Sequence, residues 1–179
     1  LVSMVLIWNA VVLEHRSLVT DPDRRRLVAD PRTRGLVRLV SLAGAAVLVA
    51  GTVVTGAGPH AGDDRAARLP FLVRDVARVH SITAIGLLAL VAYTGHRLDR
   101  ADHQGAELRA RTLRIGGLLV VQGAVGYTQY LTGVPVLLVG VHLALASLTW
   151  IEIVRLHLAI RVDMSPSVAD VGSRPLATT

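Results

Sequence analysis

Seven histidines are the residues best suited to bind a metal in this 179-residue chain, because the sequence contains no cysteine. His80 and His142 lie inside apolar stretches, where an ionisable side chain is costly and therefore a functional candidate. Four others lie at or beyond the ends of such stretches and are expected to face water and lipid headgroups: His15, His96, His103 and His157. The question is which elements position His80 and His142.

The composition indicates that these elements are membrane-spanning helices. Hydrophobic residues make up 52% of the chain and the mean hydropathy is +0.52, too apolar for a soluble domain of this length. Apolar stretches of roughly 20 residues predict four spans, at about 39–58, 71–95, 109–131 and 135–157. The expected fold is all-α: a four-helix transmembrane bundle over 39–160, preceded by the end of a truncated helix at 1–13.

Charge predicts the orientation of these spans. The net charge of +6 comes from arginine alone, and seven of the arginines lie in 14–38 and five in 96–114. Arginine-rich loops face the cytoplasm, so 14–38 is predicted to be a cytoplasmic loop and 161–179 a cytoplasmic tail. The expected location is the plasma membrane, with several passes through the lipid bilayer. Nucleic-acid binding is not expected, since no basic face with interleaved aromatic residues is present.

The two buried histidines are predicted to face each other. His80 lies nine residues after Phe71 and His142 seven after Pro135, so both imidazoles should lie about 10–14 Å below the outer face. The second and fourth helices of an antiparallel bundle are diagonal neighbours. Two imidazoles at one depth suit the axial positions of a heme iron. The alternative is a pair of histidines that are hydrogen-bonded between helices.

A second heme, held by His96 and His157, is disfavoured by helix geometry. At 100° per residue, His96 lies about 160° around its helix from His80, whereas stacked hemes need both ligands on one face.

Residues near the outer end fit a flat cofactor with acidic groups. Small residues such as Gly51 and Gly126 would let helices touch or let a macrocycle approach the backbone. Four arginines at this end could pair with heme propionates: Arg65, Arg68, Arg74 and Arg78. We take Arg74 and Arg78 as cofactor-binding candidates. His60 could either cap its helix or reach the same acidic groups.

Several motifs resemble the second half of actinobacterial heme A synthases, over about residues 1 to 160. They are Gly51-Thr-Val-Val-Thr-Gly-Ala-Gly-Pro-His-Ala-Gly-Asp63, Arg78-Val-His80-Ser, Gln122-Gly-Ala-Val-Gly-Tyr-Thr-Gln-Tyr130, Pro135 and Val141-His142. That family has two four-helix halves, and His80 and His142 match the histidine pair that holds a b-type heme in the C-terminal half. The resemblance therefore implies heme b as cofactor, with His80 and His142 as iron ligands.

The resemblance also implies an enzyme. Heme A synthase oxidises a methyl group of heme O to the formyl group of heme A, and the N-terminal half takes this substrate. Only the end of that half resembles part of this chain, at 1–13, so no catalytic residue is assigned. Heme O is the implied substrate, and heme O synthase and a second copy of the chain are the implied protein partners. Some members carry a cysteine pair that this sequence lacks.

Two other functions remain open. One is a bis-histidine b-type cytochrome that transfers electrons without a substrate of its own. The other is a heme-free membrane assembly factor.

Overall fold

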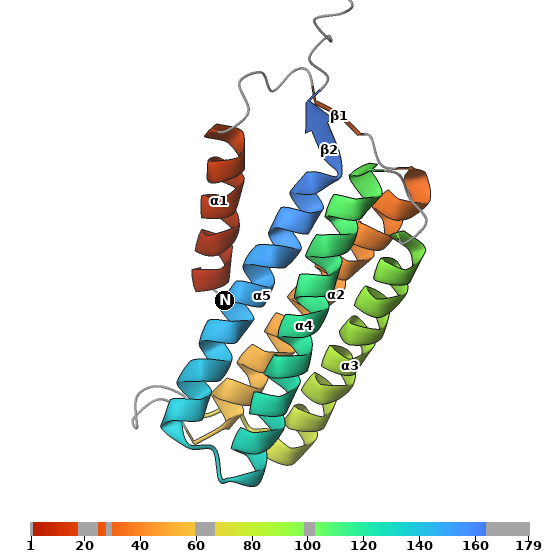
Figure 1. Cartoon of the computed structure of the whole chain (residues 1–179). Helices are drawn as coiled ribbons and strands as arrows, with labels where there is room; N and C mark the ends of the chain where they lie inside the picture. The colour runs from red at the N-terminus through yellow and green to blue at the C-terminus, as the bar shows by residue number, and fades with distance from the viewer. Residues whose placement is uncertain (1, 18–24, 28–29, 60–66, 99–102, 164–179) are drawn as a thin grey trace, which may run out of the picture.

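Five helices and one short β-ribbon make up the part of the chain that the computed structural model describes, which is residues 2–17, 25–27, 30–59, 67–98 and 103–163. In chain order the elements are α1 (Val2–Ser17), β1 (Arg25–Leu27), α2 (Pro31–Ala57), α3 (Val73–Leu98), α4 (His103–Leu131), α5 (Val136–Ala159) and β2 (Arg161–Asp163). Figure 1 shows α2 to α5 as four long helices, with α1 beside α5. The predicted helical class is confirmed, apart from the two three-residue strands.

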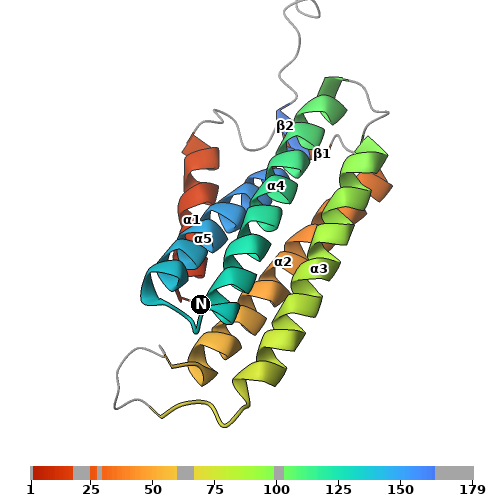
Figure 2. The same cartoon turned by 60° about the horizontal axis from the view of Figure 1, so that its bottom comes forward.

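The four long helices form a closed bundle. Each packs against the next along the chain, and α2 packs against α5 to complete the ring. Consequently α3 and α5 lie diagonally across the bundle, with α2 and α4 between them (Figure 2). We call the end that carries the β-ribbon the ribbon end. The opposite end, where α4 turns into α5, is the hairpin end (Figure 1).

Three of the four predicted spans are long and apolar enough to cross a membrane: α2, α3 and α5. α4 has 29 residues, more than the roughly 20 that a span requires. It is less apolar because polar residues interrupt its second half, and four of them line the cavity described below: Gln122, Tyr127, Gln129 and Tyr130. The first half of α4 also carries charged residues, among them Glu107 and Arg114, whose side chains are 66% and 57% exposed.

Several helices extend beyond their predicted bounds, among them α4, which begins at His103 and not at 109. α1 continues to Ser17, and α2 begins at Pro31, so that residues 31–38 form its first turns and do not belong to a loop. The Asp30 side chain caps α2 by accepting hydrogen bonds from the backbone N–H groups of Arg32 and Thr33, at 2.9 and 3.2 Å. Proline suits the first helical position because its missing N–H would have no partner there. The prediction placed these residues in a loop because they are rich in arginine. It did not take into account that Asp30 caps a helix here.

The apolar core lies toward the ribbon end. Its most deeply buried members come from the first half of α2, the second half of α3, the first half of α4 and the second half of α5: Val37, Val40, Leu87, Val91, Ile115, Ile153, Val154 and Leu156. The other half of each helix lines a cavity. The bundle is thus packed at one end and hollow toward the other.

α1 packs on α5 through aromatic and charged contacts. The Trp150 indole donates a hydrogen bond to the Met4 carbonyl at 3.1 Å, and the Trp8 and Trp150 rings lie 5.8 Å apart. Nearer the ribbon end, Arg155 pairs with Glu14 at 3.5 Å. α1 therefore covers only part of the length of α5 (Figure 1).

Short connections close the two ends. At the ribbon end, β1 and β2 pair antiparallel, with Arg26 opposite Val162. At the hairpin end, Gly133 and Val134 both have positive φ, at 80° and 60°. The Val134 N–H donates to the Gln129 carbonyl at 2.7 Å, which stops α4 with a glycine in the left-handed conformation that favours this residue.

Candidate functional site

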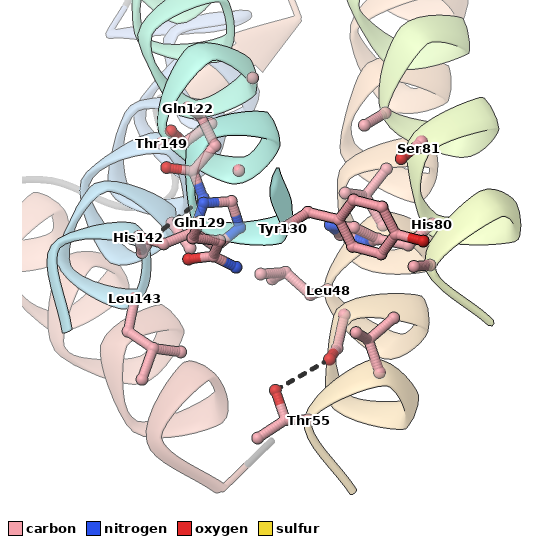
Figure 3. A pocket seen from close by; sticks show the side chains of 18 of the residues that line it. Leu48, Thr55, His80, Ser81, Gln122, Gln129, Tyr130, His142, Leu143 and Thr149 are labelled. Atoms are coloured by element: carbon pink, nitrogen blue, oxygen red, sulfur yellow. Dashed lines mark hydrogen bonds between the residues drawn. The ribbon is translucent and has the colours of Figure 1, made fainter. Parts of the chain in front are cut away.

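His80 of α3 and His142 of α5 enter one cavity from opposite sides (Figure 3). The cavity has a volume of about 1070 Å³ and is lined by all four bundle helices. Pockets that hold small molecules and cofactors have volumes of about 300–1,000 Å³. The space between the two histidines is therefore large enough for a sizeable cofactor.

The two imidazole rings are separated by a distance that suits two ligands of one metal. Their centroids lie 6.4 Å apart and their planes are inclined by 70°. A metal–imidazole bond is about 2.0 Å long, and the centre of a five-membered ring with bonds of about 1.35 Å lies about 1.15 Å from each atom. Two imidazoles on opposite sides of one metal would thus have centroids about 6.3 Å apart. The observed centroid separation of 6.4 Å is close to this value.

The unsatisfied polar atoms also gather at this cavity. Among the described residues, five buried side-chain atoms have no hydrogen-bond partner: His80 Nδ1, His142 Nδ1, Gln122 Oε1, Gln129 Oε1 and Glu152 Oε2. The first four belong to residues that line the cavity. Buried polar groups are normally paired, so unpaired ones call for an explanation such as a bound group. The two Nδ1 atoms lie toward the neighbouring helices, 3.5 Å from the position of a Cβ atom at Gly51 and at Gly126, so the alternative of two histidines that are hydrogen-bonded between helices stays open.

Each histidine lies over a glycine of the helix that precedes its own. A Cβ atom at Gly51 of α2 would lie 3.1 Å from Cε1 of His80, and a Cβ atom at Gly126 of α4 would lie 3.1 Å from Cε1 of His142. The two helical hairpins, α2–α3 and α4–α5, therefore hold their histidines in the same way.

The only metal-binding geometry that this arrangement offers is a pair of ligands. The described residues contain no cluster of three or more histidine, cysteine, aspartate or glutamate side chains. A bare metal ion would need more protein ligands than two, whereas a heme iron takes four of its six ligands from the macrocycle. The residues present therefore fit a heme better than a bare ion.

Arg74 and Arg78 lie on α3 and line the cavity from its outer part. Both are weakly paired with Asp75, at 3.5 and 3.9 Å, and their side chains are 63% and 68% exposed. Exposed guanidinium groups at a cavity mouth remain free to pair with a ligand's carboxylates. His60 and Arg65 lie outside the described residues, and Arg68 donates to the Pro59 carbonyl at 3.3 Å.

His15, His96 and His157 are not among the residues that line this cavity. His96 is exposed on α3, as expected. His157 differs from the expectation, because its Nδ1 lies 3.0 Å from the Ser41 hydroxyl and its ring packs 5.8 Å from that of Trp8. It joins α5 to α1 and α2 and is therefore a structural contact more than a surface residue.

Sequence reasoning named the histidines but missed Gln122 and Gln129 as site residues. They are spaced seven apart, which places them on one face of α4, and both line the cavity. Their spacing within an otherwise apolar stretch was the signal that could have identified them. The glycines were noted as small residues, but their contact with the histidine rings depends on how the helices cross.

The geometry described above defines a helical membrane protein with a bis-imidazole cavity. Comparison of the chain with known protein families, with curated proteins and with solved structures finds no match.

Proposed function

We propose that this chain binds heme b between His80 and His142 and is the heme b-binding part of a membrane-bound heme A synthase. The observation that carries the proposal is the 6.4 Å separation of two imidazoles inside a cavity of about 1070 Å³. The resemblance of its glycine-rich, histidine and glutamine motifs to that family suggests the particular enzyme. α4 then serves as a fourth transmembrane span, with its polar face turned to the cofactor.

The chain's own residues would bind and orient the cofactor. His80 and His142 would hold the heme iron, while Gly51 and Gly126 leave room for the imidazole rings. Arg74 and Arg78 would pair with the propionates at the mouth. Bound heme supplies one-electron redox chemistry. With both axial positions taken by histidine, neither residue is expected to act as an acid or base.

The heme proposal is tested by purifying the chain in detergent and recording its absorption and pyridine-hemochrome spectra. We expect one b-type heme per chain with the low-spin spectrum of a six-coordinate iron. A colourless protein after expression with adequate heme supply would reject the proposal and favour a heme-free membrane assembly factor.

The enzymatic proposal needs a separate experiment. In heme A synthases the substrate belongs to the N-terminal half, which this chain resembles only at 1–13. We therefore propose that the chain alone binds heme b but does not oxidise added heme O. Product analysis by chromatography tests this, and formation of heme A by the isolated chain would show that the substrate site lies within these residues.

A further inference from the structure

The two histidine sites differ in the residue that lies four positions before each glycine. Val47 on α2 and Gln122 on α4 each lie four residues before the glycine beneath a histidine ring. Only Gln122 has a side chain that can form hydrogen bonds, so the α4–α5 site has a polar contact that the α2–α3 site lacks.

The Gln122 side chain binds the backbone of the ligand residue itself. Its Nε2 donates a hydrogen bond to the His142 carbonyl at 3.0 Å. That carbonyl belongs to an α-helix, in which it also serves the N–H four residues later. The contact from Gln122 is therefore an additional constraint that ties α4 to α5 at the histidine.

The corresponding contact at His80 does not cross between helices. There the Thr83 hydroxyl donates to the His80 carbonyl at 2.8 Å, and Thr83 lies three residues further along the same helix. Such a bond leaves the distance between α3 and α2 unconstrained. His80 is positioned against its glycine by packing, whereas His142 is positioned by packing and by an interhelical hydrogen bond.

We infer that Gln122 is a positioning residue that holds His142 at bonding distance from the cofactor metal. The inference rests on the proposed heme site. It adds a residue that would not bind the iron itself, because its side-chain amide nitrogen donates to the His142 carbonyl. Without the Gln122 bond, α5 is free to shift along α4, and the His142–iron bond is the one that weakens.

Reaction of the reduced heme with carbon monoxide tests this inference, because carbon monoxide binds only where an axial ligand dissociates. The variants are Gln122→Met, which keeps the length of the side chain, and Gln122→Glu, which keeps its shape but loses the N–H donor. With dithionite as reductant, we expect the fraction of carbon monoxide complex to rise about fivefold or more in both, the effect of one lost hydrogen bond. The g values of the oxidised low-spin heme, measured by electron paramagnetic resonance, depend on the angle between the two imidazole planes and should also change.

Thr83→Val is the matched control. It also removes one hydrogen bond to the carbonyl of a ligand histidine, but this bond lies within a single helix. We expect its carbon monoxide reactivity to equal that of the wild type.

If both Gln122 variants bind heme and react with carbon monoxide no more than Thr83→Val, the inference is wrong while the heme site stands. A wild-type protein without heme would instead reject the proposed function. Should Gln122→Met fail to fold, Gln122→Glu alone decides.

Discussion

At the scale of the residue, His80 and His142 can face each other because they lie at a similar depth in the bundle. His80 lies seven residues after the start of α3 and His142 six after the start of α5, and both helices begin at the hairpin end (Figure 1). Equal distances from the same end bring the rings to the same level. The ring centroids lie 6.4 Å apart in a cavity of about 1070 Å³, so the pair is suited to bind a group between them.

Removing either imidazole should abolish six-coordination. We expect His80→Ala and His142→Ala to lose the low-spin spectrum, because each removes one of two axial bonds. His96→Ala is the control, since its side chain is exposed and lies outside the cavity. Absorption spectra and heme content of the purified variants provide the measurement. A His80 variant with the wild-type spectrum and full heme content would contradict the assignment.

The glycines beneath the rings yield a second prediction. Gly51→Ala and Gly126→Ala would each place a Cβ atom 3.1 Å from a ring carbon, a contact so tight that the imidazole must shift by a few tenths of an ångström. We expect several-fold faster loss of heme to an excess of apomyoglobin.

Alanine at Gly86 or Gly117 provides the matched control, because a Cβ atom at either position meets nothing within 4 Å. These variants should retain heme and gain roughly 1 kcal/mol of stability from helix propensity. Equal heme loss in all four variants would mean that the effect comes from the helix backbone and not from the histidines.

The sequence of a single helix shows how deep a residue lies along that helix, but not which residues of other helices lie beside it. Position along a span is readable from sequence, so the shared depth of His80 and His142 followed from counting residues. Which residue of a neighbouring helix lies beside a ring depends on crossing angle and rotation, which no single span contains. For this reason the contact of Gln122 with the His142 carbonyl came only from the structure.

At the scale of the element, the start of α2 shows how a local bond overrides composition. The segment 31–38 is rich in arginine and was predicted to be loop, yet the capped N-terminus at Asp30 begins a helix there. Three of the four predicted spans match helices that are long and apolar enough to cross a membrane, because apolar length is a strong signal. The ends of helices depend on single hydrogen bonds and are harder to predict.

The Asp30 cap can be tested by substitution. Asp30→Ala should destabilise α2 by about 1 kcal/mol, whereas Asp30→Asn should retain the cap at neutral pH. Thermal unfolding in detergent, followed by circular dichroism, measures the difference. Unchanged unfolding of Asp30→Ala would show that α2 starts without this cap.

The same cap predicts a pH dependence. Hydrogen bonds from the Thr33 side chain and then its backbone N–H hold the pKa of Asp30 below its ordinary value. A carboxylate with a depressed pKa in the folded state stabilises the fold above the ordinary pKa, about 3.9, and loses this contribution as the pH falls through the lower value. The stability of the wild type relative to Asp30→Asn should therefore decline below about pH 4. A difference that stays constant between pH 6 and pH 2 would contradict this.

At the scale of the whole molecule, the bundle has one packed end and one hollow end. The core side chains gather toward the ribbon end and the cavity toward the hairpin end. Such a division lets one half stabilise the helices while the other leaves space for a cofactor. The sequence alone did not predict this division, because apolar residues are abundant along every span.

The orientation of the bundle in a membrane is predicted by its arginines. We expect the ribbon end to face the cytoplasm and the hairpin end to face outward. Since the chain has no cysteine, Thr132→Cys and Ala106→Cys each introduce a unique thiol at an exposed position near opposite ends. A membrane-impermeant maleimide should label Thr132→Cys from outside intact cells, and Ala106→Cys only after permeabilisation. Labelling of both from one side would contradict the bundle topology.

The ribbon formed by β1 and β2 has a consequence for chain connectivity. It pairs Arg25–Leu27, just before α2, with Arg161–Asp163, just after α5, so the two ends of the four-helix segment meet at one place. Adjacent ends allow a circular permutation, in which a short linker joins them and the chain is opened at the turn of Gly133 and Val134. The permuted order would be α5, α2, α3 and α4, and each histidine would still rest on its own glycine. The cavity thus depends on which helices are neighbours and not on the order in which they are made.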